Sequence, residues 1–427
     1  MSKMKHLAIC IALVLVCSYS RAEVQLDKNY SPSIAGVKLF SGSQFSYPIM
    51  NVGATNALEL HFDDMDGIVK SYSYTFVLCD ADWQPADMSP FDYIKGFLTN
   101  RISQYRASSI ATTRYMHYIA YLPERNSVPV KSGNYILKVF LNGDTSKLAF
   151  TRRFLVVDNV VPVGVQILQP FDITKARTSQ KIQFTLDKKQ LNIFNTPQQL
   201  KVAVLQNFRW DNAITGMQPM FMRGDLYEYN GERDFLFPAG KEFRWADLRS
   251  FRFQSDRVEN ATLNTQPFEV WLKPDADRTR LGYLYYEDYN GFFEVNSTEN
   301  INPWWQGDYA RVHFTYVPAG NQPLPGKDIY VVGQMNNYEL NDSSKLTYNA
   351  EKGVYERSLF LKQAYYSYIY VTKDIGAKDA VPSMDYTEGN YWETENTYTV
   401  LVYYRAMGDR YDQLVGMVTL NSRLNRR

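Results

Sequence analysis

The segment that most constrains the fold is residues 72–83, YSYTFVLCDADW, because its side chains alternate in character without a break. The residues on one face are large and apolar: Tyr72, Tyr74, Phe76 and Leu78. A period of two is typical of a pleated strand that is half buried by a second layer. Asp80 and Asp82 then end the strand, because short carboxylate side chains accept hydrogen bonds from nearby backbone N–H groups. We expect Trp83 to fold back over the edge of the core.

A second strand signal lies in residues 132–139, SGNYILKV, where Gly133 and Asn134 interrupt the chain before an alternating run. We expect the first domain, residues 23–158, to be built between these two segments. Its other strand candidates are residues 57–62, 115–123 and 152–157.

Similar strand signals continue to the end of the chain, with short turns between them. A second domain is predicted for residues 159–304, which restart after Pro162; its clearest strands are residues 163–168, 181–186 and 199–206. A third is predicted for residues 305–427, with strands in residues 308–317, 328–340, 353–361, 365–374 and 397–406. Short strands at this spacing predict an all-β fold of tandem immunoglobulin-like β-sandwich domains in series, the last of them E-set-like.

The first 22 residues have the pattern of a cleaved signal peptide. Lys3 and Lys5 precede an apolar run, and Ser20 and Ala22 are small residues at the positions that a signal peptidase reads. The sequence therefore predicts export. A lipoprotein acylated at Cys17 is the alternative, but bulky Val16 stands where a small residue is usual.

The charge balance gives no reason to expect an anionic partner. Loss of the signal peptide would leave 43 of the 46 basic residues against 45 acidic residues. We therefore expect no nucleic acid partner and no direct attraction to an anionic membrane. An Arg-aromatic mixture containing Arg209, Arg244, Arg249 and Arg252 resembles a single-strand binding surface, but stacking and salt bridges within the fold are the preferred interpretation.

The mature chain would keep one cysteine, Cys79, so that no internal disulfide could form and the cores must hold the fold. No mature segment approaches the length of an apolar membrane helix. An outer-membrane barrel is the other all-β alternative, but long irregular stretches such as residues 84–109 interrupt the strand ladder that a barrel needs.

Residues that could support catalysis are scarce. His61, His117 and His313 are isolated in strand patterns without metal-ligand spacing, and Asp80 with Asp82 fits a turn better than a glycosidase carboxylate pair. The Asp63–Gly67 segment lacks the ligand spacing of an EF-hand and is predicted to be a hairpin turn. We predict a non-enzymatic protein with no catalytic, metal-binding or cofactor-binding residues and no small-molecule substrate.

Several motifs in order resemble one known family. They are CDADW (79–83), IKGF (94–97), YMHYIAYLP (115–123), SGNYILKV (132–139), TRRFLV (151–156), LQNFRWDNA (205–213) and KEFRWADLRS (241–250). Over residues 35–315 the chain resembles the plug proteins of the type IX secretion system. The resemblance implies a periplasmic protein, associated with the outer membrane only through its partner, that docks on the inner mouth of the translocon barrel. It would close the pore while no substrate crosses.

The last domain resembles, more weakly, immunoglobulin-like modules that accompany glycan-active enzymes. Residues 332–338, VGQMNNY, correspond to their V-G-x-F-N-x-W turn, with Met335 and Tyr338 in place of the two aromatic residues. An exported carbohydrate-binding protein is therefore the alternative function. Trp304 and Trp305, where the third domain is predicted to begin, are candidate partner-interface residues, with packing at the domain junction as the simpler role.

Overall fold

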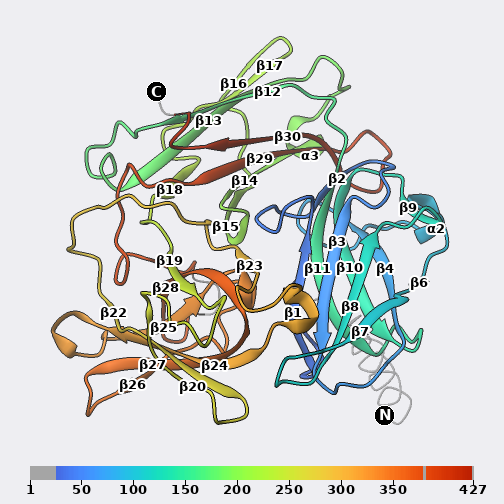
Figure 1. The fold of residues 1–427 in the computed structure, drawn as a ribbon. Coiled ribbons are helices and arrows are strands. Elements are labelled where there is room, and N and C mark those ends of the chain that lie inside the picture. The colour runs from blue at the N-terminus through green and yellow to red at the C-terminus, as the bar shows by residue number, and fades with distance from the viewer. Residues whose placement is uncertain (1–25, 378–380, 426–427) are drawn as a thin grey trace, which may run out of the picture.

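The computed structural model describes residues 26–377 and 381–425, so the predicted signal peptide lies outside the described residues. The regular secondary structure of the described chain is nearly all β, and its strands pair into several sheets, which confirms the predicted all-β, multi-domain sandwich class (Figure 1). In the described ranges, the helices are too short and too polar to cross a bilayer.

The first unit is a sandwich of two main sheets, with strand orders β1-β3-β8-β7 and β2-β11-β10-β4-β6, and a small β5-β9 pair. Its elements are β1 (Ile34–Phe40), β2 (Ile49–Asn51), β3 (Leu58–Asp64), β4 (Tyr72–Cys79), α2 (Pro90–Tyr93), β5 (Ile94–Gly96), β6 (Asn100–Arg101), β7 (Gln104–Ala107), β8 (Met116–Leu122), β9 (Ser127–Pro129), β10 (Gly133–Leu141) and β11 (Leu148–Val157). The two segments that the sequence singled out are neighbours, because β4 pairs antiparallel with β10 and places Leu78 opposite Tyr135.

The alternation along β4 has the predicted effect on packing. The large apolar face, Tyr72 to Leu78, lies in the core between the two sheets of the first unit. Cys79 lies on the opposite face, where it packs in a separate apolar cluster with strands of the second unit. Both faces of this sheet are therefore covered, one by its own unit and one by a neighbour.

The second unit joins two stretches of chain that are far apart in sequence. Its elements are β12 (Val163–Leu168), β13 (Ser179–Asp187), α3 (Thr196–Gln199), β14 (Leu200–Gln206), β15 (Arg209–Thr215), β16 (Phe221–Arg223), β17 (Leu226–Tyr229), β18 (Leu236–Pro238), β29 (Thr397–Tyr404) and β30 (Gln413–Asn421). One sheet has the order β12-β13-β17-β16, with β18 on β13, and the other has the order β15-β14-β29-β30.

The third unit lies between these two stretches. Its elements are β19 (Arg244–Asp247), β20 (Val258–Thr262), β21 (Phe268–Leu272), β22 (Asp275–Ala276), β23 (Phe293–Val295), α4 (Pro303–Gln306), β24 (Tyr309–Val317), η1 (Ala319–Asn321), β25 (Lys327–Val332), η2 (Gln334–Asn336), β26 (Thr347–Asn349), β27 (Val354–Lys362) and β28 (Ala364–Asp374). One sheet is built around β28, which pairs with β19, β23 and β25, and the other has the order β20-β21-β24-β27-β26.

The predicted boundary at residues 304 and 305 does not separate sheets. The parallel pair of β21 with β24 crosses it, and so does the antiparallel pair of β14 with β29. The units predicted as residues 159–304 and 305–427 are thus interleaved, with the third unit inserted into the second. Strand periodicity shows where strands lie, but the partner of a strand depends on contacts that can be two hundred residues away.

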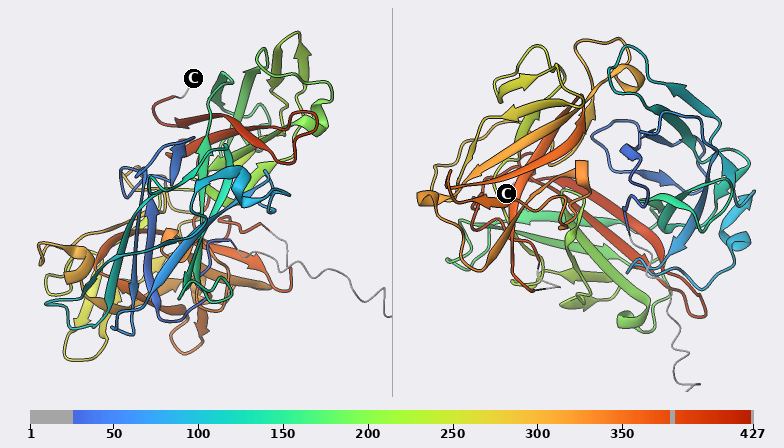
Figure 2. Two further views of the ribbon diagram at one scale, coloured as in Figure 1. Left: turned by 90° about the vertical axis from the view of Figure 1, so that its right-hand side faces the viewer. Right: turned by 90° about the horizontal axis from the view of Figure 1, so that it is seen from below.

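The three units pack around a common centre, with the first at the right of Figure 1, the second at the top and the third at the lower left. The view from below shows the same closed arrangement (Figure 2). The sheet containing β3 and β8 faces the third unit, and the sheet containing β10 and β11 faces the second. Most of the sites described below lie along these contacts, and one ion cluster lies within the third unit.

Candidate functional site at the junction of the units

The two predicted interface tryptophans lie on α4, where the third unit meets the first. Trp304 stacks on His61 of β3, with 3.6 Å between ring centroids and an interplanar angle of 6°. The Trp305 ring lies 4.6 Å from the guanidinium carbon of Arg106 on β7. Both tryptophans are half-buried. A large part of each aromatic surface therefore serves contact between units of the same chain.

A chain of polar side chains runs beneath Trp304. His61 Nε2 lies 2.6 Å from Glu59 Oε1, and His61 Nδ1 lies 2.9 Å from His117 Nε2. His117 Nδ1 lies 2.6 Å from Asp63 Oδ1. Alternation along β3 puts Glu59, His61 and Asp63 on one face, and the register with β8 places Asp63 opposite His117.

The Asp63 carboxylate continues this chain into the third unit. Its Oδ2 atom accepts hydrogen bonds from Lys362 Nζ at 2.5 Å and from Tyr309 Oη at 2.6 Å. Burial tends to raise the pKa of Asp63, but the charge of Lys362 and the hydrogen bonds from His117 and Lys362 outweigh burial and hold the pKa below its ordinary value. Asp63 is therefore an anion shared between the two units.

Both histidines of this cluster are held in the neutral form. Burial lowers the pKa of His61 to about 4, against the opposing effect of Glu59. Burial also lowers the pKa of His117, although Asp63 acts in the other direction. Desolvation dominates because both rings are almost wholly enclosed. This cluster joins the first and third units. The sequence predicts the two histidines to be isolated strand residues, but the register of β3 with β8 brings them together.

The residues that follow β4 form the contact with the second unit. Asp80 pairs with Arg405 at 2.8 Å, and its carbonyl oxygen accepts the N–H of Trp83 in a turn. Asp82 Oδ1 accepts the N–H of Gln84 at 3.3 Å. The predicted turn is thus confirmed, but only the Asp82 carboxylate accepts a nearby backbone N–H. The Asp80 carboxylate instead binds Arg405 and the N–H of Asp412, and so holds the C-terminal hairpin.

Cys79 lies within the same contact, buried among apolar side chains of both units. Burial raises the pKa of its thiol to about 12. The thiolate, which is the nucleophilic form, is therefore suppressed. A catalytic thiol needs the opposite environment.

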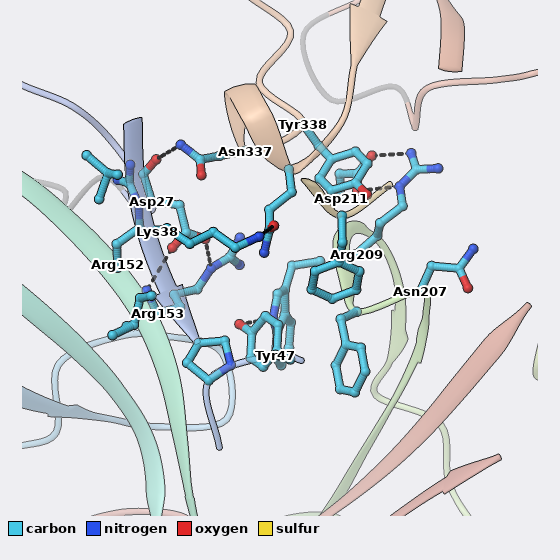
Figure 3. Close-up of a pocket in the computed structure, with 17 residues that line it drawn as sticks. Asp27, Lys38, Tyr47, Arg152, Arg153, Asn207, Arg209, Asp211, Asn337 and Tyr338 are labelled. Atoms are coloured by element: carbon cyan, nitrogen blue, oxygen red, sulfur yellow. Dashed lines mark hydrogen bonds and ion pairs between the residues drawn. The ribbon is translucent and has the colours of Figure 1, made fainter. Parts of the chain in front are cut away.

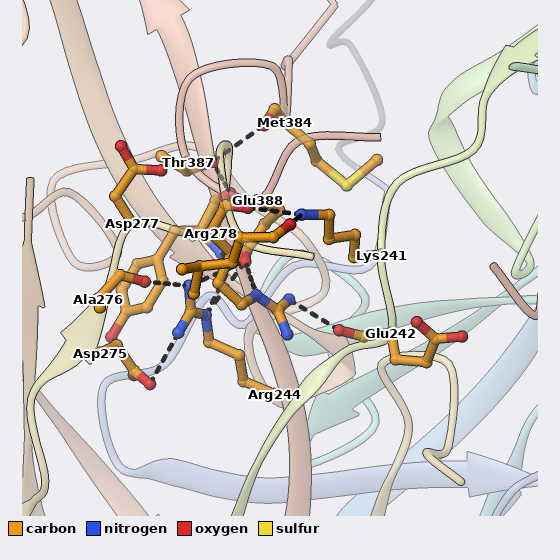
Figure 4. A network of polar contacts seen from close by, with 12 residues as sticks. Lys241, Glu242, Arg244, Asp275, Ala276, Asp277, Arg278, Met384, Thr387 and Glu388 are labelled. Carbon is orange, nitrogen blue, oxygen red and sulfur yellow. Dashed lines mark hydrogen bonds and ion pairs between the residues drawn. The ribbon is translucent and has the colours of Figure 1, made fainter. Parts of the chain in front are cut away.

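The Arg-aromatic motif builds a buried ion cluster inside the third unit (Figure 4). Arg244 donates to Glu388 and to Asp275, both at 3.0 Å, and Arg278 Nε donates to Glu388 at 2.6 Å. Burial favours protonation of Glu388, but the two arginines outweigh it and lower its pKa to about 2. The prediction that these arginines form salt bridges within the fold is confirmed for Arg244.

The remaining arginines of that motif behave in two ways. Arg209 pairs with Asp211, and Arg249 pairs with Asp247, each at 2.6 Å. Arg252 is exposed, and the described part of the chain provides no ion pair for it. Three of the four arginines are therefore structural.

A cavity of about 100 Å³ lies where all three units meet (Figure 3). The first unit contributes part of β1, Tyr47 and the Arg152-Arg153 pair of β11; the second contributes the β14–β15 turn; the third contributes the segment around η2. Both aromatic and charged side chains line its wall. They include Tyr47, Phe208, Trp210, Phe292 and Tyr338 together with Asp27, Lys38, Arg152, Arg153, Arg209 and Asp211.

Three sequence motifs that are distant along the chain converge on this cavity: TRRFLV, LQNFRWDNA and VGQMNNY. The last was the basis of the carbohydrate-binding alternative. The Tyr338 ring is not a free surface on which a sugar could stack. It lies 5.0 Å from the guanidinium carbon of Arg209, and its hydroxyl donates to the Asn290 carbonyl. That turn instead holds the second and third units together.

Two bulky residues at the cavity adopt left-handed backbone conformations. Phe208 has φ 54° and Tyr338 has φ 57°, and each follows an asparagine with the same sign of φ. A positive φ is uncommon for bulky side chains and is retained where the surroundings determine it. The strain places the aromatic ring of Phe208 on Tyr47, with 5.0 Å between centroids.

Fold and site together define a class of protein: a multi-domain β-sandwich protein whose three units are locked around a polar and aromatic junction. A family model described as the type 9 secretion system plug protein 1st domain matches residues 34–158, the span of the first unit. The first unit of this chain therefore belongs to the type IX secretion system plug protein family.

A solved structure extends this likeness to nearly the whole chain. A crystal structure of a hypothetical protein from Parabacteroides merdae ATCC 43184 is 32% identical, with a TM-score of 0.87. The match covers 93% of this chain and 99% of that chain. Among curated proteins, none matches.

Proposed function

We propose that this chain is a non-enzymatic plug of the type IX secretion system, which binds the periplasmic mouth of the outer-membrane translocon barrel and closes its pore when no substrate is crossing. The single observation that supports this most is the family match over the first unit. The export signal in residues 1–22 is consistent with a periplasmic location.

The contacts between the units give the protein the rigidity that a pore plug needs. A body that closes a pore must keep its shape against the passage of solutes, and hinged domains would leak. The first unit is joined to the third through Asp63 and Lys362, and to the second through Asp80 and Arg405. Apolar clusters accompany these ion pairs, so the units form one packed body.

Trp304 and Trp305 remain proposed contact residues for the translocon. Each is half-buried, so part of each ring is available to a partner while the rest holds the first and third units together. Aromatic rings at an interface bury a large area at little cost in side-chain entropy. A seal would need a broad contact of at least about 1,600 Å² in total.

The direct experiment is purification of the tagged full-length protein from gently solubilised membranes, followed by identification of what accompanies it. We expect a large outer-membrane barrel in stoichiometric amount. A second measurement is uptake of a hydrophilic dye too large for general porins, which should rise in cells that lack the protein. Recovery of the protein alone, together with unchanged dye uptake, would exclude the proposal.

A further inference from the structure

The cavity at the three-unit junction is lined by more basic than acidic side chains. Four basic side chains line it, Lys38, Arg152, Arg153 and Arg209, against two carboxylates, Asp27 and Asp211. Each carboxylate already pairs with an arginine. Asp27 pairs with Arg153, and Asp211 forms two hydrogen bonds with Arg209, of 3.1 and 2.6 Å.

The other two cations have only neutral hydrogen-bond partners among the described residues. Lys38 reaches across the cavity (Figure 3) and donates to the Phe293 carbonyl at 2.5 Å and to Gln334 Oε1. Arg152 donates to the Thr151 carbonyl at 2.7 Å and to Asn29 Oδ1 at 2.8 Å. Both side chains are buried, at 1% and 6% exposure.

More distant carboxylates offset this charge only in part. Burial lowers the pKa of Lys38 well below its ordinary value, against the opposing effect of Glu294, and lowers the pKa of Arg152 to about 10, against Asp27 and Glu339. No carboxylate lies within ion-pair distance of these two side chains in the described chain. A buried cation without an anionic partner is costly, and an anion that enters the site removes that cost. The excess of basic side chains thus favours an anionic ligand.

Size and lining define the guest further. About 100 Å³ is smaller than the roughly 150 Å³ of an apolar cavity that holds benzene, so the guest is compact. The aromatic wall, including Phe208 and Phe292, suits a short carbon portion beside the charge. Phe208 reaches this wall through its left-handed backbone conformation, which the packing maintains.

We propose that this cavity binds a small carboxylate, between Lys38 and Arg152, at the point where the three units meet. The carboxylate is supplied by a free small acid or by the C-terminus of a peptide, since both present the same group. This site goes beyond the proposed plugging function and does not depend on it.

The test uses the indole N–H of Trp210, which lies in the cavity wall and donates to Tyr47 Oη at 3.0 Å. The full-length protein is titrated with acetate and with acetamide, its neutral counterpart, at constant ionic strength, and the indole resonance is followed by NMR. We expect a saturable shift with acetate and none with acetamide. N-acetylglycine serves as the probe for a chain end: tighter binding than acetate assigns the peptide source, and weaker binding assigns the free acid.

Variants locate the binding site. Lys38→Met and Arg152→Gln should each weaken acetate binding at least tenfold. The control is Lys95→Met, which makes the same Lys-to-Met change at an exposed position on β5 and should leave acetate binding unchanged. Equal shifts with acetate and acetamide in the unmodified protein would overturn the proposal, and that comparison does not depend on the folding of any variant. Unchanged acetate binding in a folded Lys38→Met protein would overturn it as well.

Discussion

The ammonium group of Lys362, in the third unit, pairs with the carboxylate of Asp63, in the first, and each side chain is only 2% exposed. The pair joins residues 299 positions apart in sequence. The ion pair therefore links the first and third units directly.

Removing one partner of this pair should destabilise the protein strongly. Asp63→Asn leaves Lys362 buried without an anion, which should cost about 3 to 5 kcal/mol of unfolding free energy. The double variant Asp63→Asn with Lys362→Met should recover part of that loss, because the unpaired charge is gone. Urea unfolding of the four proteins of the cycle measures this, and additive losses would contradict a coupled pair.

Acid should weaken the contact between the first and third units. The pKa of His61 is about 4 in the folded protein, below its ordinary value of 6.5, so the unfolded chain binds more protons between these values. Stability is then fully present above pH 6.5 and is lost as the pH falls toward 4. Between pH 7 and pH 5 this histidine should contribute a loss of about 2 kcal/mol.

The matched variant for the acid effect is His61→Gln, which keeps hydrogen-bonding groups but does not titrate. Its unfolding free energy, measured at pH 7 and pH 5, should change less than that of the unmodified protein. Glu59, His117 and Asp63 face the same ring and stay in both proteins, so the difference isolates His61. An identical pH dependence in the two proteins would refute this role.

Trp304 should contribute to stability through its stack on His61 and Phe40. Trp304→Ala should reduce the unfolding free energy by about 2 to 4 kcal/mol, and Trp304→Phe should reduce it less because a ring remains. Ile301→Ala is the control, since Ile301 is fully exposed nearby in sequence and should change stability little. Thermal unfolding followed by circular dichroism measures the effect. Unchanged stability of the Trp304→Ala variant would show that the stack does not stabilise the fold.

Gly36 permits the close approach of the third unit to β1. Its φ is 58°, and an added Cβ would lie 2.7 Å from Tyr309 Oη. Gly42 also has a positive φ, 72°, but open space around it. Both Gly→Ala variants should lose about 1 kcal/mol from backbone strain, and Gly36→Ala should lose more because it also displaces Tyr309. Equal melting temperatures for the two variants would argue against this contact.

Cys79 should be chemically silent in the folded protein. Its thiol is buried and its pKa is raised to about 12, so a thiol reagent at pH 8 should react only after unfolding. The measurement is the rate of modification in buffer and in denaturant. Rapid reaction in buffer would mean that the contact between the first and second units opens readily.

Local sequence patterns predicted the strands well. The alternation of residues 72–79 corresponds to β4, and residues 163–168 correspond to β12. Such patterns depend on neighbours along the chain, which the sequence displays directly. The aspartates after β4 were likewise recognisable as a turn, because the Asp80 carbonyl and the Asp82 carboxylate bind backbone N–H groups three and two residues away.

What could not be predicted depends on pairing between distant segments. His61 and His117 looked isolated, since only the register of β3 with β8 brings them together. A search for titratable residues on the same predicted strand face, here Glu59, His61 and Asp63, would have been the available signal. The junction cavity needs all three units in place, and no single segment contains its pattern.

The insertion of the third unit into the second sets an order of assembly. Strand β14 has β15 beside it from the start, but its other edge stays open until β29 has been made, almost two hundred residues later. Folding of the second unit can therefore be completed only after β29, near the end of the chain, has reached the compartment in which the protein folds. A truncated product that stops before β29 exposes a bare strand edge, the kind of surface that quality-control proteases and chaperones recognise.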